Sequence, residues 1–147
     1  MNTKKFLIGG LAGGIIYFVL GYLFYGKLLS DFFHNNAGTA TGVDRAMEQF
    51  QWWSLVLGNV LSGCLLSYVF VKSNVSSAGS GLVTGAVIGL LASASYDFVS
   101  YGVANLMTTT GVLGDIGTFT VMSAITGAIV GWVCGLIGKT PVTNTTA

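Results

Sequence analysis

Charged side chains are scarce in this sequence. Only 7% of its 147 residues are Asp, Glu, Lys or Arg, whereas a soluble domain carries about a quarter of such residues. Six basic residues are nearly balanced by five acidic ones, so the chain has no basic face for nucleic acid. Hydrophobic residues make up 52% of the chain, and its mean hydropathy is +0.75. These values exclude a soluble enzyme, a disordered tail and a nucleic-acid binder, and they indicate a small integral membrane protein.

Residue types that build metal and catalytic sites are also rare, since the chain has one histidine and two cysteines. Cys64 and Cys134 fall in apolar stretches at different depths, which favours small core residues over a disulfide. The sequence has no nucleophile–base pair, phosphate-binding loop or haem motif, so we expect no cofactor. An enzyme that acts on lipid therefore ranks behind the two functional classes given below.

Four apolar stretches each have about the 20 residues that a helix needs to cross a bilayer. Glycine and alanine dominate them, and apolar and polar residues do not alternate, which favours helices over strands. The predicted spans are residues 6–25, 53–71, 82–104 and 118–137, in one domain over 1–140 with a polar tail over 141–147. The expected fold is an all-α, four-helix transmembrane bundle in contact with the lipid bilayer.

The first apolar stretch also has the form of a secretory signal peptide, because Lys4 and Lys5 precede it. Its apolar run is longer than that of a signal peptide. Gly26-Lys27-Leu28-Leu29 follows the run, in place of a cleavage site with small residues. We therefore expect the stretch to be retained as the first span.

Basic residues predict the orientation. Those on one side of the predicted spans are Lys4, Lys5, Lys72 and Lys139, and those on the other side are Lys27 and Arg45. The positive-inside rule then predicts that both termini are cytoplasmic. Every acidic residue falls toward the outer side, which is explained either by repulsion from anionic cytoplasmic lipids or by a mouth that attracts cations.

The two halves of the sequence resemble each other. Gly10-Leu11-x-x-Gly14 matches Gly81-Leu82-x-x-Gly85, and Ser62-Gly63-x-Leu65-Leu66 matches Thr126-Gly127-x-Ile129-Val130. The matches suggest the duplication of a two-helix hairpin, with the two copies in parallel orientation.

Glycines recur at every fourth residue within the predicted spans. Such series let helix backbones approach closely in lipid, where no hydrophobic force draws helices together. The predicted packing glycines are Gly10, Gly14, Gly81, Gly85, Gly89, Gly127, Gly131 and Gly135. We expect their grooves to pack within the bundle itself, and a homodimer or a larger membrane partner is the alternative.

Asp97 is the most informative residue of the chain. A carboxylate within a span costs about 2.5–3.5 kcal/mol on insertion scales and usually faces a partner or a polar cavity. At an estimated depth of roughly 10 Å, Asp97 shares a layer with Asn59 and Ser123. Tyr22 lies slightly shallower and Tyr96 precedes Asp97. This layer is either a pocket for a cation, a proton or a ligand's polar head, or a hydrogen-bonded cluster that fixes the bundle's register.

Asp31 and His34 lie three residues apart on a predicted interfacial helix, and Asp115 precedes the predicted fourth span on the same side. With Asp44 or Glu48, these residues are candidates for a divalent metal site. Solvation of the same groups at the interface is the simpler interpretation. Asp115 is also placed to cap the N-terminus of the fourth span.

The segment Tyr96-Asp97-Phe98, followed by Asn105-Leu106 and Asp115, resembles the Tyr-Asp-Leu-Thr-Asn segment of small four-helix bacterial membrane proteins of unknown function. The first span, rich in Gly and Tyr and followed by Leu-x-Asp-Phe-Phe, is similar as well. The sequence departs from the pattern at Phe98-Val99-Ser100. The resemblance implies four helices and a location in the bacterial inner membrane, and it places Asp97 and Asp115 at the family's two acidic positions.

Two functional classes follow from these patterns. The first is a binding or transport protein that handles a cation, a proton or a small solute through the polar layer around Asp97. The alternative is a structural or regulatory membrane subunit that docks a partner through its glycine-lined helices.

Overall fold

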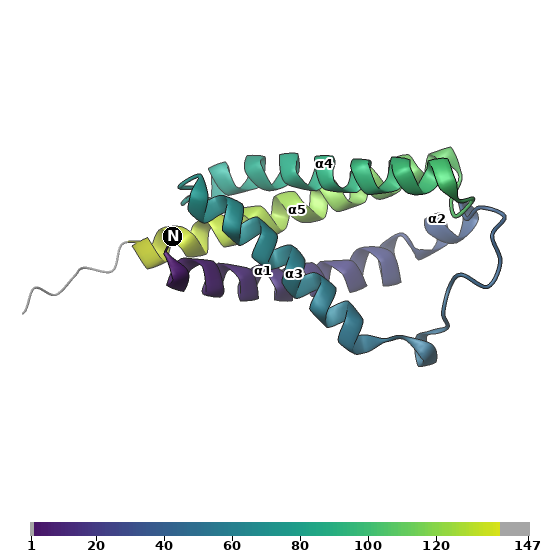
Figure 1. The fold of residues 1–147 in the computed structure, drawn as a ribbon, viewed down its shortest axis with the longest axis horizontal. Helices are drawn as coiled ribbons and strands as arrows, with labels where there is room; N and C mark the ends of the chain where they lie inside the picture. The colour runs from purple at the N-terminus through teal and green to yellow at the C-terminus, as the bar shows by residue number, and fades with distance from the viewer. Residues whose placement is uncertain (1, 139–147) are drawn as a thin grey trace, which may run out of the picture.

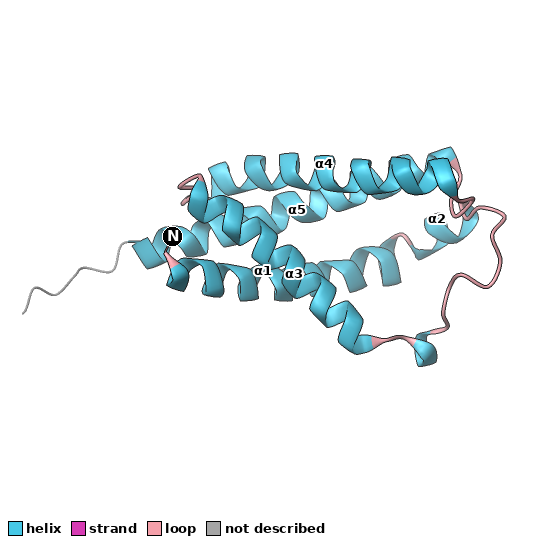
Figure 2. Ribbon diagram, in the orientation of Figure 1, coloured by secondary structure: helices cyan, strands magenta, loops and turns pink. Residues whose placement is uncertain are grey.

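The computed structural model describes residues 2–138, and four long helices dominate them (Figure 1). These are α1 (Thr3–Leu23), α3 (Trp52–Lys72), α4 (Ala78–Val103) and α5 (Thr109–Gly138). Three short elements connect α1 to α3: the π-helical turn η1 (Phe24–Leu28), α2 (Ser30–Asn35) and the 3₁₀ turn η2 (Met47–Gln49). Over this range the structure has helices and loops and no named strand, which confirms the predicted all-α fold (Figure 2).

All four long helices have the length and apolar composition of membrane spans. The chain is therefore a small multi-pass membrane protein, as predicted. The helix that contains the predicted fourth span begins before residue 118, since α5 starts at Thr109. The Thr108 hydroxyl caps the start of this helix by accepting a hydrogen bond of 3.2 Å from the Gly111 N–H. The polar, Thr-rich segment at the start of α5 is therefore helical, although its sequence is typical of a loop. Lys139 and the predicted tail lie outside the described residues.

The side chains of α1 are distributed in the reverse of the soluble pattern. Its glycines and Tyr17 face the bundle, whereas Leu7, Leu11, Ile15 and Val19 form an exposed aliphatic stripe with a spacing of four residues. In lipid such a stripe meets hydrocarbon of its own polarity, and close packing holds the helices together. The helix is thus built to be apolar outside and narrow inside.

Glycine contacts assemble two helical hairpins. In the first, a Cβ placed on Gly14 of α1 would lie 2.8 Å from Val60 Cα of α3. In the second, a Cβ on Gly85 of α4 would lie 3.0 Å from Gly127 Cα of α5. These positions have no room for a side chain, so the backbones touch.

The predicted duplication gains support from the contacts of two aligned glycines. Gly63 of α3 lies against Gly10 and Gly14 of α1, and Gly127 of α5 lies against Gly81 and Gly85 of α4. The sequence alignment pairs these same positions. Residues that match in sequence therefore make equivalent contacts in the two hairpins.

The predicted packing glycines all contact other segments of the same chain. Gly89 meets Ser123, Gly131 meets Gly81, and Gly135 meets the backbone at Ser76. Each of the predicted packing glycines therefore lies against a neighbouring segment of the same molecule.

α1 joins the two hairpins through α5. The Tyr17 ring stacks on Phe119 with 5.8 Å between ring centroids, and its hydroxyl donates to Ser123 Oγ at 2.9 Å. α3 diverges from the other helices toward its N-terminus, where residues 52–58 are all exposed (Figure 1). The bundle is therefore closed at the end where α1 begins and more open at the opposite end.

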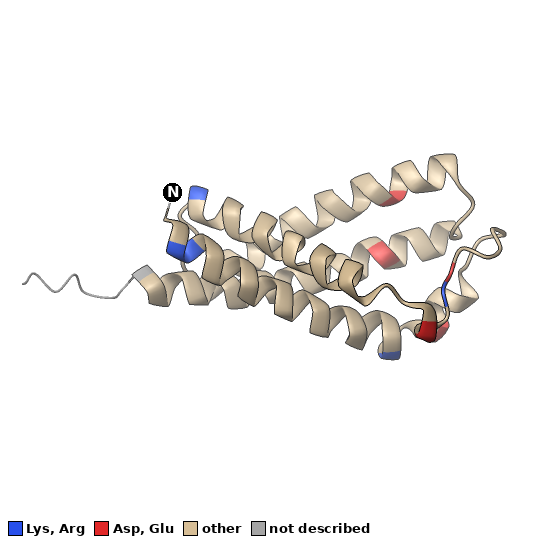
Figure 3. Ribbon diagram, turned by 60° about the horizontal axis from the view of Figure 1, so that its bottom comes forward, with Lys and Arg blue, Asp and Glu red and all other residues tan. Residues whose placement is uncertain are grey.

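Charge is segregated along the bundle. Lysines gather at the end where α1 begins and α3 ends, whereas the acidic side chains lie toward the opposite end, accompanied by Lys27 and Arg45 (Figure 3). The first described residue and the end of α5 lie at the lysine-rich end (Figure 1). We refer to this end as the lysine end and to the other as the acidic end.

Candidate functional site

The packing of α4 on α5 places Asp97 opposite Asp115. Gly85 faces Gly127 and Gly89 faces Ser123, so each step of four residues along α4 is matched by four residues in the opposite direction along α5. Two further steps bring Asp97 of α4 level with Asp115 of α5, so the two carboxyl groups are neighbours across the contact between these helices. Asp97 is only 1% exposed. The structure thus contains a carboxyl pair inside the bundle.

Tyr25 completes this site from η1, the turn that follows α1. Its hydroxyl donates to Asp115 Oδ1 at 2.5 Å. Tyr25 lies in η1, where the Leu29 N–H donates to the Phe24 carbonyl at 2.8 Å, five residues back along the chain. Such π-helical turns are rare and occur frequently at functional sites. Three helical segments therefore converge on one carboxyl pair.

Aromatic rings of α2 pack beside the carboxyl pair, on the side toward the acidic end of the bundle. The Phe32 ring lies directly on Gly114, next to Asp115, at a distance that leaves no space for a Cβ. The Phe33 ring lies 5.1 Å from that of Tyr25 and packs edge-on against Phe32. The two rings therefore pack against the neighbours of the carboxyl pair, Gly114 and Tyr25.

Two buried oxygens in the described part of the chain have no hydrogen-bond partner: Asp97 Oδ2 and Thr126 Oγ1. Asp97 belongs to α4 and Thr126 to α5. Between Asp115 and Thr126 along α5 lie Thr118 and Ser123, which are also buried. A buried polar atom without a partner is costly and marks a place where a proton, an ion or a water is expected.

The structure brings only part of the predicted polar layer together. Ser123 is fully buried, but it faces Tyr17 and Gly89, about 12 Å along α4 from Asp97 by the rise of the helix. Asn59 lies against Gly14 on the side of α1, and its amide donates to the Leu55 carbonyl of its own helix at 2.8 Å. The depth estimated for Ser123 was too small, because the fourth helix begins earlier than the sequence suggested.

The two predicted tyrosines point elsewhere. Tyr22 is 52% exposed, with the Lys27 ammonium 5.6 Å from the centre of its ring, and Tyr96 is 71% exposed. Neither is buried with Asp97. The tyrosine that does reach the pair is Tyr25, which the sequence analysis did not identify as a site residue.

The predicted metal ligands are separated. Asp31 and His34 are exposed on α2, while Asp115 points into the bundle toward Tyr25. Within residues 2–138 no three His, Cys, Asp or Glu side chains come close enough to hold a metal. The expectation that Asp115 caps the fourth helix was also wrong, because Asp115 lies well inside α5.

The chemistry of the site follows from its composition. A carboxyl pair with one phenolic donor, buried in apolar surroundings, binds a proton or a small cation better than an anion. Comparison with protein-family models, with curated proteins and with solved structures found no match.

Proposed function

We propose that this membrane protein binds protons at the Asp97–Asp115 pair and conducts them across the bilayer. The observation that carries the proposal is the buried Asp97 carboxyl, whose Oδ2 has no hydrogen-bond partner and which faces a second carboxyl. A buried acid within a span is expensive to insert, and such residues are typical of ion and proton pathways.

The carboxyl pair is suited to exchanging one proton. Two ionised carboxylates that lie side by side repel strongly in a medium of low polarity, and a proton held between them removes the repulsion. The charged and titratable groups that face Asp97 are Asp115 of α5 and, through it, the Tyr25 hydroxyl of η1. Uptake of a proton from the acidic end therefore changes the contact between α4, α5 and η1.

A route from the pair toward the lysine end runs along the inner face of α5. Thr118, Ser123 and Thr126 are all buried on this face, and Tyr17 bonds the middle one. Hydroxyl groups both donate and accept, so they support the passage of a proton together with intervening water. The unpartnered Thr126 oxygen lies on this route.

The proposal includes an orientation in a bacterial inner membrane. The excess of lysine at one end favours the cytoplasm for that end, with the carboxyl pair toward the outside. Asp31, an exposed acid of α2 at the outer mouth, would raise the local concentration of cations there.

Proton flux into proteoliposomes tests the proposal. With a pH-sensitive dye inside and an imposed pH difference, the unaltered protein should give a flux that depends on external pH. Asp97→Asn should remove it, because an amide cannot exchange the proton. Asp44→Asn, an exposed acid of the same charge, is the matched control and should keep the flux. Equal flux in Asp97→Asn and the unaltered protein would overturn the proposal.

The alternative of a structural subunit predicts the opposite sensitivity. Asp97→Asn would then leave function intact, whereas bulky residues at Gly127 or Gly131 would abolish assembly with a partner. Because both glycines pack against α4 in the same chain, the structure lends this alternative no specific support.

A further inference from the structure

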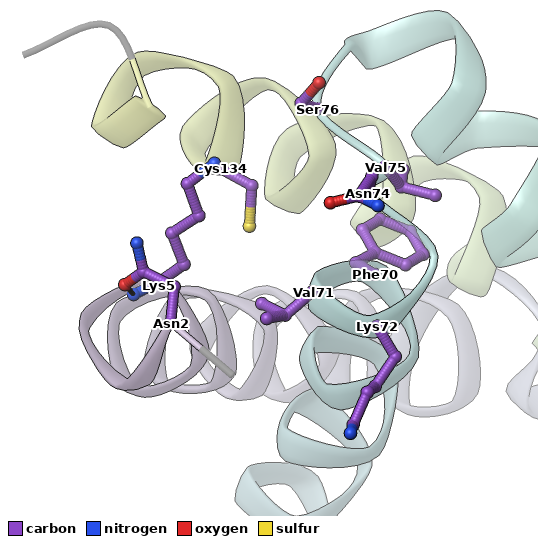
Figure 4. A pocket seen from close by; sticks show the side chains of 9 residues that line it. All are labelled: Asn2, Lys5, Phe70, Val71, Lys72, Asn74, Val75, Ser76 and Cys134. Atoms are coloured by element: carbon purple, nitrogen blue, oxygen red, sulfur yellow. Dashed lines mark hydrogen bonds between the residues drawn. The ribbon is translucent and has the colours of Figure 1, made fainter.

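A second site lies at the lysine end, away from the carboxyl pair. A cavity of about 480 Å³ opens there between the start of α1, the end of α3, the α3–α4 turn and α5 (Figure 4). Its lining residues are Asn2, Lys5, Phe70, Val71, Lys72, Asn74, Val75, Ser76 and Cys134. The sequence analysis did not identify this site, because its residues come from four separate parts of the chain.

The cavity has a positive character. Lys5 is half-buried, whereas Lys4, Lys27, Arg45 and Lys72 are exposed, so Lys5 is the least exposed basic side chain among residues 2–138. All acidic side chains of the described chain lie toward the other end (Figure 3). A partly buried ammonium group without a neighbouring carboxylate favours a bound anion.

Hydrogen-bond donors accompany the charge. Asn2 uses its Oδ1 to accept from the Lys5 N–H at 3.1 Å, so its amide nitrogen has donor capacity left. Asn74, in the left-handed conformation with φ of 54°, brings a second amide to the cavity, while Ser76 lines its edge with the hydroxyl directed outward (Figure 4). An ammonium group and amide donors around one space match the oxygens of a phosphate group.

The position of the cavity suggests where a phosphate would come from. Lys5 lies in the first turn of α1 and Lys72 is the last residue of α3, so the cavity lies at the boundary of the membrane spans. Phospholipid phosphates occupy this depth. Phe70 and Val71 continue the lining with apolar walls on the hydrocarbon side (Figure 4). Basic pockets between spans on the cytoplasmic side are known to suit anionic headgroups.

We propose that this cavity binds a phosphate group, supplied by the headgroup of an anionic phospholipid. Lys5 contacts the phosphate from within the cavity, and Lys72 lies at the rim, where its side chain extends away from the centre toward Tyr68 (Figure 4). The proposal does not depend on proton conduction, because it uses other residues at the opposite end of the bundle.

Native mass spectrometry of the full chain from mixed phosphatidylglycerol and phosphatidylcholine nanodiscs tests this site. The unaltered protein should retain phosphatidylglycerol, and Lys5→Gln should weaken this binding about tenfold, the effect of losing one charged hydrogen bond. Lys5→Arg keeps the charge and should restore binding. Circular dichroism of each variant checks that the helices are formed.

Lys4→Gln is the matched control, because Lys4 carries the same charge one residue away, is exposed and does not line the cavity. High salt screens the general attraction of the Lys4 charge to anionic lipid. At high salt, Lys4→Gln should therefore bind phosphatidylglycerol like the unaltered protein. Competition with inorganic phosphate distinguishes the sources: displacement at similar concentrations would identify free phosphate as the ligand of the same site. Equal retention of both lipids, or equal losses in Lys4→Gln and Lys5→Gln, would overturn the proposal.

Discussion

At the scale of single residues, the polar groups of the interior differ in whether their hydrogen bonds are satisfied. Ser93 donates to the Gly89 carbonyl at 2.8 Å, and Thr118 to the Gly114 carbonyl at 2.7 Å, so both are satisfied by their own helices. Tyr17 and Ser123 satisfy each other. Asp97 and Thr126 differ, because each keeps a buried oxygen without a partner. A polar group that only stabilises the fold has no need of an unpartnered oxygen, so these two oxygens point to a role in function.

Thr126→Val separates the two roles by experiment. Valine has the shape of threonine and lacks the unpartnered hydroxyl, so the free energy of unfolding should stay the same or rise by about 1 kcal/mol. Proton flux should fall at the same time, because the hydroxyl lies on the proposed route. Unfolding in a detergent titration and dye-monitored flux measure the two effects. Loss of stability with unchanged flux would show that the hydroxyl serves packing alone.

At the scale of helices, the site depends on how α4 and α5 are aligned. Glycines at three successive turns of α4, Gly81, Gly85 and Gly89, meet small residues of α5 and allow one close alignment. Sliding α5 by one turn would separate Asp97 from Asp115. The glycine contacts therefore position the carboxyl pair, although they lie far from it along the helices.

Gly127→Ala tests this alignment. A Cβ at this position would meet the Gly81 carbonyl and would lie 2.9 Å from Gly85 Cα, so the helices must move apart, at a cost of about 1–3 kcal/mol. Gly117→Ala, on the exposed face of the same helix with nothing within 4 Å, is the control. It should be neutral or stabilising by about 0.4–1 kcal/mol. Detergent unfolding measures both variants, and equal stabilities would contradict the close packing described above.

The sequence predicted the helices better than their alignment. Hydropathy and length identified four spans, and the cost of a buried charge singled out Asp97. Its partner Asp115 was assigned to a loop boundary, because the Thr-rich start of α5 has no apolar pattern that marks it as helix. The π-helical turn that directs Tyr25 inward depends on tertiary packing and has no sequence signature. Depth along separate helices becomes comparable only after the contacts between them are known.

At the scale of the whole molecule, two polar sites lie at opposite ends of an apolar bundle. The carboxyl pair is at the acidic end under Phe32 and Phe33, and the Lys5 cavity is at the lysine end. The repeat of two hairpins explains how such a small chain forms a closed core without a large apolar interior. The two ends of the bundle differ because different residues accompany the packing glycines that the two hairpins share.

The orientation of this asymmetric molecule gives the last prediction. Four basic residues at or beyond the lysine end oppose two at the acidic end, so Lys4→Gln with Lys5→Gln leaves two against two. The positive-inside rule then predicts a population with mixed orientation. Cysteines introduced as Ser73→Cys and Thr41→Cys, both exposed, report the two ends after Cys64→Ala and Cys134→Ala.

With the natural lysines, an impermeant thiol reagent applied to intact cells should label Thr41→Cys, and should label Ser73→Cys only after permeabilisation. In the doubly substituted chain both positions should become partly labelled in intact cells. Labelling of Ser73→Cys from outside with the natural lysines would reverse the orientation. It would also place the carboxyl pair toward the cytoplasm and the Lys5 cavity in the outer leaflet, so the direction of proton uptake proposed above depends on this result.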